Sequence, residues 1–154
     1  MRQSDLERIR KNRDQVSDSY AKLGQFIYKC LYSREYGVFE DAAALGKKYQ
    51  DILVELLGNA DIAGMLQKDL DQKMNGVFTR LKADFPYFST REQLVFCYTT
   101  VGFPNWLIWK LAGLSSENAV CIMKTRMRQE INSHYSPWRD EYLFLLSYKR
   151  LPNW

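Results

Sequence analysis

The chain has 154 residues, of which 46% are hydrophobic and 26% charged, and its formal net charge is +4. These values are typical of soluble globular domains and exclude a disordered or collagen-like chain. The longest apolar runs span five residues, far fewer than the ~18 that a membrane-spanning helix needs. The first fifteen residues carry alternating charges and cannot act as a secretory signal. We therefore expect a cytoplasmic chain, or the cytoplasmic part of a longer one, with no membrane contact.

The cysteines Cys30, Cys97 and Cys121 are odd in number, widely spaced and set among apolar neighbours. This arrangement is neither a disulfide framework nor a metal-ligand cluster, so we expect buried, reduced thiols and no metal or other cofactor. Residues 85–154 hold eight basic and five acidic side chains, an excess of three positive charges. Such an excess permits a polyanionic partner without requiring one.

Residues 1–33 carry a long helical pattern. Its inward positions alternate three and four residues apart, which is the spacing of a coiled coil, and Arg13 is the single polar break. One interpretation is a dimerisation helix that forms a homodimer, and the other is an amphipathic helix lying on its own domain. In either case we expect residues 26–32, which are rich in aromatic side chains, to fold onto the body of the protein. The predicted dimerisation residues are Leu6, Ile9, Val16, Tyr20, Leu23 and Ile27.

Residues 34–86 are expected to form a helical spacer. One helical pattern follows Gly37 and runs over residues 39–56, and the next runs over residues 62–81. The latter must stop near Asp84, because Pro86 lacks an amide hydrogen and disfavours helix at the residue before it. No stretch of the sequence shows sustained strand alternation. We therefore predict an all-α fold.

Residues 87–133 contain the most specific signals. Ser89-Thr90-Arg91-Glu92 is a capping box and predicts that a helix begins there. Gly102 and Gly113 can end this helix and a short second helix over residues 106–112. A serine at 115 or 116 can cap a third helix that turns its apolar side inward. The inward residues are Val120, Met123, Met127 and Ile131.

This order of helices is that of a helix-turn-helix, whose last helix enters the DNA major groove. The segments Phe88-Ser89-Thr90-Arg91-Glu92, Val101-Gly102-Phe103-Pro104-Asn105, Ile108 and Gly113-Leu114-Ser115 resemble the LuxR/NarL (GerE-like) helix-turn-helix. The resemblance is closer to bacterial output regions in which this module follows a coiled coil and a helical spacer, with motifs like residues 75–86 and 124–128. It implies a transcriptional regulator, often downstream of an N-terminal sensor region that this chain would lack.

Helix order and resemblance together predict a dimeric regulator that binds double-stranded DNA. Residues near the bases would be Asn118, Cys121, Ile122 and Thr125, and residues on phosphates would be Lys124, Arg126, Arg128 and Lys110. We expect no enzymatic activity, because the only histidine, His134, accompanies no paired cysteine, glycine-rich phosphate loop or nucleophile-base spacing.

A second hypothesis is a degenerate helix-turn-helix that serves protein interaction or dimerisation without sequence-specific DNA binding. Its basis is the apolar stretch 119–123 on the presumed recognition helix, together with Trp106 and Trp109, where the family usually has polar or small residues. The C-terminal extension, residues 134–154, would either pair two modules or cover these tryptophans. Its apolar stripe is Trp138, Tyr142, Leu145 and Leu146.

Overall fold

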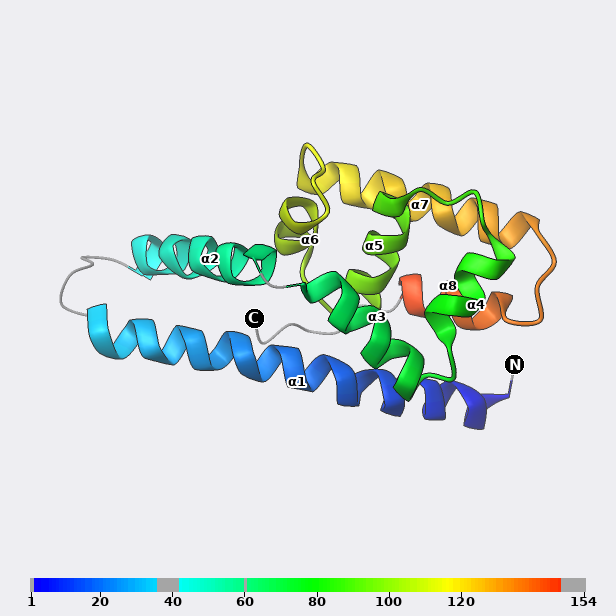
Figure 1. Cartoon of the computed structure of the whole chain (residues 1–154), viewed down its shortest axis with the longest axis horizontal. Coiled ribbons are helices and arrows are strands. Elements are labelled where there is room, and N and C mark those ends of the chain that lie inside the picture. The colour runs from blue at the N-terminus through cyan, green and yellow to red at the C-terminus, as the bar shows by residue number, and fades with distance from the viewer. Residues whose placement is uncertain (1, 36–41, 60, 148–154) are drawn as a thin grey trace.

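The computed structural model describes residues 2–35, 42–59 and 61–147. All regular secondary structure in these ranges is helical, which confirms the all-α prediction. The helices are α1 (Gln3–Glu35), α2 (Ala42–Asn59), α3 (Ile62–Lys73), α4 (Val77–Asp84), α5 (Thr90–Thr100), α6 (Asn105–Leu111), α7 (Glu117–Ser133) and α8 (Arg139–Ser147). Figure 1 shows α1 along the lower edge, α2 beside it at one end, and the remaining helices gathered over the other part.

The C-terminal part is built around α5. Every side chain from residue 95 to residue 101 is buried, and α3, α6, α7 and α8 all pack against this helix. In Figure 1, α5 accordingly stands in the middle of the group. A helix surrounded on all sides needs no polar face. The buried hydroxyl of Thr100 has a hydrogen-bond partner within the helix, because it donates to the Phe96 carbonyl oxygen at 2.7 Å.

α1 lies along its own chain and packs against α2 and α3. Of the six predicted dimerisation residues, those with at most 8% exposure are Ile9, Val16 and Tyr20. They are core residues of the same chain, so in this fold they are not available to a dimer seam. Leu6 and Ile27 are half-buried, and Leu23 is 43% exposed. The structure thus corresponds to the amphipathic-helix interpretation, and the homodimer stays a prediction.

Arg13, the polar break in the α1 pattern, is fully buried. Its Nε donates a 2.9 Å hydrogen bond to the carbonyl oxygen of Thr100 at the end of α5. The last carbonyls of a helix lack partners within the helix and carry partial negative charge, so a guanidinium suits this position. Tyr20 donates to Asp69 of α3 at 2.8 Å, and its ring centroid lies 6.0 Å from that of Phe103. Polar and aromatic contacts therefore fasten α1 to α3 and to the corner after α5.

The spacer differs from its prediction in one respect. The expected single helix over residues 62–81 is wrong, because α3 and α4 are separated at Asn75 and Gly76, whose φ angles are 55° and 70°. The Asp71 carboxylate accepts from the amide of Phe78 at 2.7 Å and so satisfies one of the unpaired donors at the start of α4. α4 ends at Asp84, as predicted. Gly37 and the first residues of the second predicted helix lie outside the described residues.

The three helices of the predicted helix-turn-helix lie close to their expected positions. α5 begins at Thr90, with both hydrogen bonds of the capping box present: Ser89 Oγ accepts at 3.1 Å and Glu92 Oε1 accepts at 2.9 Å. α6 begins at Asn105, one residue before the prediction. The Ser116 hydroxyl caps α7 by accepting from the amide three residues on, at 3.2 Å.

Gly102 and Gly113 make the corners between these helices, with φ angles of 84° and 71°. Side chains with a Cβ atom disfavour this left-handed region, so glycine is the suitable residue at both corners. The expectation that the glycines end the first two helices is therefore met.

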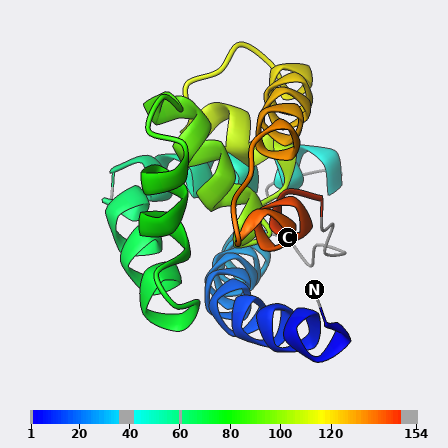
Figure 2. The same ribbon diagram turned by 90° about the vertical axis from the view of Figure 1, so that its right-hand side faces the viewer.

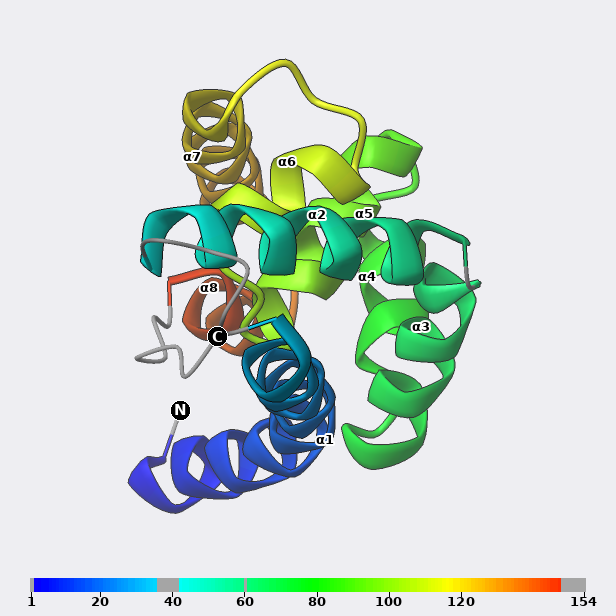
Figure 3. The same ribbon diagram turned by 90° about the vertical axis from the view of Figure 1, so that its left-hand side faces the viewer.

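α8 packs against α5 and α7, and Figure 2 shows it below α7. Tyr142, Leu145 and Leu146 are buried as predicted, whereas Trp138 is 39% exposed. α6 packs against α5 and α7 and also against α2, which lies beside it in Figure 3. The described part of the C-terminal extension therefore braces the last helix of the module, while α2 lies against the helix that carries the two tryptophans.

Two smaller expectations need correction. Cys97 is buried but Cys121 is exposed, because Cys121 falls on the outer side of α7. The aromatic segment after residue 25 packs only in part: Tyr28 contacts Tyr49 of α2 with ring centroids 5.4 Å apart, while Phe26 is 65% exposed. The side chain of Cys30 lies outside the described residues.

Candidate nucleic-acid interface

The outer side of α7 carries one row of exposed side chains, which we call the α7 face. Its members are Asn118, Cys121, Ile122, Thr125, Arg126 and Gln129. Spacings of three and four residues place them on one side of the helix. Residues 121 to 129 of this row line a shallow depression of about 340 Å³. In Figure 1 α7 lies along the upper edge of the molecule.

The opposite side of α7 fixes the helix in place. Val120, Met127 and Ile131 are completely buried, Met123 is half-buried, and α5 and α6 lie against them. Close-packed side chains in a core hold a helix in one rotational setting. The α7 face is therefore presented by a rigid support, and the four predicted base-proximal residues all lie on it.

The predicted phosphate-binding cations of α7 differ in availability. Lys124 is half-buried, and its Nζ donates to Asn105 Oδ1 of α6 at 2.9 Å. Arg128 donates through Nη1 to the carbonyl oxygen of Leu146 in α8 at 3.2 Å. Arg126 is exposed on the α7 face. Two of the three basic side chains therefore already hold neighbouring helices of the same chain.

Lys110, the fourth predicted cation, lies at the end of α6 with its Nζ 5.5 Å from the centre of the Trp109 ring. An ammonium over an aromatic face is weakly attracted to it. Trp109 and Trp106 are both half-buried against the core. The tryptophans that looked unusual in the sequence thus support α6 from within the fold.

The start of α7 is not a strongly positive site. Ser116 caps the helix, and the exposed Glu117 stands in its first turn. A carboxylate there stabilises the helix end but repels an approaching phosphate. Glu117 and Arg126 together leave the outer surface of this helix nearly neutral in formal charge.

Asn105 of α6 contacts Cys121 of α7, because its Nδ2 lies 3.5 Å from the Cys121 Sγ. The Asn105 side chain therefore contacts both Lys124 and Cys121 and braces α6 against α7. In the sequence Asn105 could be recognised only as part of the corner motif, because a contact across two helices leaves no local pattern. Gln129 was also missed, although its spacing of seven residues from Ile122 places it on the same face.

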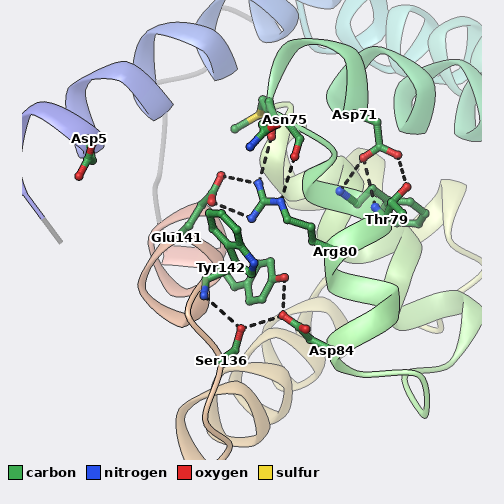
Figure 4. Close-up of polar contacts among 12 residues, drawn as sticks. Asp5, Asp71, Asn75, Thr79, Arg80, Asp84, Ser136, Glu141 and Tyr142 are labelled. Atoms are coloured by element: carbon green, nitrogen blue, oxygen red, sulfur yellow. Dashed lines mark hydrogen bonds and ion pairs between the residues drawn. The ribbon is translucent and has the colours of Figure 1, made fainter.

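A polar cluster between α4 and α8 was not predicted, and Figure 4 shows it. Arg80 of α4 donates to both carboxylate oxygens of Glu141 in α8, at 3.0 and 3.3 Å. The guanidinium carbon of Arg80 lies 4.1 Å from the ring centre of Trp138. Bidentate pairing with an aromatic stack is a geometry to which arginine is suited. These contacts fix α8 to the spacer.

Asp84 completes the cluster (Figure 4). Its Oδ2 accepts from the hydroxyl of Ser136 at 2.7 Å and from that of Tyr142 at 2.8 Å. Burial, with a smaller contribution from the Asp84 hydrogen bond, raises the pKa of Tyr142 well above its ordinary value. Burial also raises the pKa of the Cys97 thiol, which suits a structural rather than a reactive cysteine.

Within the ranges that the structure describes, no group of acidic, histidine and cysteine side chains could hold a metal ion. In the same ranges, no helix is long and apolar enough to cross a membrane. Comparison with family models, with curated proteins and with solved structures finds no match to this chain.

Proposed function

We propose that this protein is a transcriptional regulator that binds double-stranded DNA through the α7 face. The observation that carries the proposal is the exposed row of side chains along α7. The opposite side of α7 packs on α5 and α6, and the three helices follow one another in the helix-turn-helix order. A helix presented in this way fits the major groove, which is about 12 Å wide.

The α7 face supplies different kinds of contact along its length. The amide of Asn118 can pair with adenine, the hydroxyl of Thr125 can bond to either purine or pyrimidine edges, and Ile122 can pack on a thymine methyl group. Arg126 is placed to reach a phosphate oxygen or a guanine edge. The first three would read bases, and Arg126 would add affinity through a phosphate or would read a guanine.

Lys124, Arg128 and Lys110 complete the phosphate contacts in this proposal. Lys124 and Arg128 would have to exchange their present hydrogen bonds to Asn105 and Leu146 for phosphate oxygens, or share them. Arg126 needs no such exchange, since it is exposed. We therefore expect Arg126 to have the largest single effect on affinity.

Binding of the purified chain to mixed genomic duplex fragments at ~50 and ~200 mM salt tests the proposal. Four phosphate contacts should weaken binding on the order of a hundredfold across that range. Arg126→Ala should lower the slope of log affinity against log salt by about one. The matched control is Lys68→Ala, which removes an exposed charge from α3 and should leave the slope unchanged. Equal slopes for the two variants would contradict the role of Arg126.

A second candidate function is protein recognition through the same face. It is favoured by the hydrogen bonds that engage Lys124 and Arg128 and by the 52% exposure of Ile122 on an almost neutral surface. Absence of duplex binding even at ~50 mM salt would favour this candidate over DNA binding. In either case a homodimer would have to form without the core positions of α1, because these are buried in the chain.

A further inference from the structure

A cavity of about 180 Å³ lies where α1, the turn between α3 and α4, and α8 meet, and we call it the α1–α8 cavity. None of its lining residues belongs to the α7 face. Pockets for drug-sized molecules hold roughly 300–1,000 Å³. A ligand for this cavity must therefore be smaller than those.

The floor of the cavity is an ion pair without net charge, and an aromatic ring forms one wall. Glu141 is 6% exposed, and both of its carboxylate oxygens accept from Arg80. Arg80 also donates from Nε to the Asn75 carbonyl oxygen at 3.0 Å and from Nη2 to the Met74 carbonyl oxygen at 3.1 Å. The charge of Glu141 is therefore balanced within the fold, as Figure 4 shows. Trp138 adds a half-exposed ring at the side.

The rim adds two positive charges that the floor does not balance. Arg8 comes from α1 and Lys73 from the end of α3. The Lys73 ammonium has no ion pair within residues 2–35, 42–59 and 61–147. Arg8 lies 3.5 Å from Asp5, but both groups are exposed. An exposed ion pair of this kind contributes little to the free energy of folding. The side-chain amides of Asn12 and Asn75 also border the cavity and can donate hydrogen bonds.

We propose that the α1–α8 cavity binds a phosphate group, either as the free anion or as a small phosphomonoester. Two cations from different helices match the charge of a phosphate dianion, and the amides supply further donors to its oxygens. The Trp138 ring gives an apolar wall for a short organic group attached to the phosphate. The neutral floor keeps Glu141 from repelling the ligand.

Such a ligand would join three segments that are distant in sequence. α1 provides Arg8 and Asn12, the end of α3 and the turn after it provide Lys73 and Asn75, and the residue before α8 provides the Trp138 wall. Because the complete site exists only when α1 is docked on the body, binding would stabilise the docked arrangement by mass action. This inference does not depend on the proposed DNA binding.

Thermal unfolding of the full chain in the presence of sodium phosphate and of glycerol 3-phosphate tests the proposal. Sodium chloride at equal ionic strength is the reference for general salt effects. The test variant is Arg8→Gln with Lys73→Gln. The matched control is Lys11→Gln with Lys68→Gln, which removes two exposed charges from the same two helices but none from the cavity rim.

We expect the midpoint of the wild-type chain and of the control to rise saturably, by on the order of 5 °C at a hundredfold excess of ligand over its dissociation constant. The test variant should bind at least tenfold more weakly. Tighter binding of glycerol 3-phosphate would identify a phosphomonoester site, and tighter binding of inorganic phosphate a free-anion site. Equal shifts in all three chains, or shifts no larger than those in chloride, would overturn the proposal. Duplex binding can be measured separately on the same variants, so failure of one proposal leaves the other open to its own test.

Discussion

The predicted helix-turn-helix region and the junction of α1, α4 and α8 are held by different kinds of contact. In the first, the helix ends are set locally: Ser89 and Glu92 cap each other three residues apart, and Gly102 turns the chain. In the second, Arg80 of α4 bonds to a carboxylate of α8 61 residues away. The contact between α1 and the first region is also distant in sequence, since Arg13 bonds to a carbonyl of α5 87 residues away. Local signals position the candidate interface, whereas distant polar pairs determine what packs around it.

The largest expected effect comes from breaking the junction. Arg80→Ala removes both hydrogen bonds from the buried Glu141 carboxylate and should lower the free energy of unfolding by about 3–5 kcal/mol. Chemical denaturation followed by circular dichroism measures the change. Lys68→Ala, an exposed site on α3, should change the free energy by less than about 0.5 kcal/mol. Similar values for both would show that the ion pair does not hold α8 in place.

The next largest loss of stability is expected at a corner of the predicted helix-turn-helix. Gly113 has a φ of 71°, so Gly113→Ala forces a side chain into the left-handed region at a cost of about 1–2 kcal/mol. Gly46→Ala is the matched comparison, because this glycine lies inside α2 with open space around it. Alanine there should stabilise the protein by up to about 1 kcal/mol. Effects of the same sign in thermal unfolding would contradict the described turn.

A buried tyrosine gives the junction a pH dependence. Tyr142 has a raised pKa in the folded chain, whereas an unfolded tyrosine titrates near pH ~10. Stability from this group is present below about pH 10 and is lost as the pH rises further, because the unfolded chain then ionises first. Tyr142→Phe should cost about 1 kcal/mol at neutral pH and make the loss above pH 10 less steep. Denaturation series at pH 8 and pH 11 compare the two chains, and parallel losses would refute the assignment.

The smallest expected loss of stability comes from a change in the capping box at the start of α5. Ser89→Ala removes the oxygen that accepts from the Glu92 amide and should cost about 1 kcal/mol. Thr90→Ala, at the neighbouring exposed position, retains the cap and should have little effect on thermal stability. A larger loss for Thr90→Ala than for Ser89→Ala would place the start of α5 elsewhere.

The sequence predicted those features whose cause is local. The cap at Ser89 and the corner at Gly102 follow from residue type and spacing. The break at Asn75 and Gly76 was missed because apolar residues continue in helical register on both sides of it. The sequence shows Arg13 as a polar residue in an otherwise apolar helical pattern. Its partner could not be predicted, because it is a backbone carbonyl that only the fold brings near.

The candidate site was likewise predictable only in part. Helical spacing placed Asn118, Ile122 and Thr125 on the outer side of α7, and the structure has them exposed there. Spacing could not show that Lys124 reaches α6 and that Arg128 reaches α8, since both contacts depend on how the helices pack. The number of basic side chains in a predicted recognition helix is therefore a poor measure of how many would be available to phosphates.

The most direct test of the proposed DNA binding is to follow the backbone amide signals of the full chain by nuclear magnetic resonance as a duplex is added. We predict that the largest shifts fall on residues 117–129, with the strongest effect near Arg126, and that signals around the α1–α8 cavity change little. Shifts confined to other helices, or no shifts at low salt, would contradict the claim that the α7 face binds DNA.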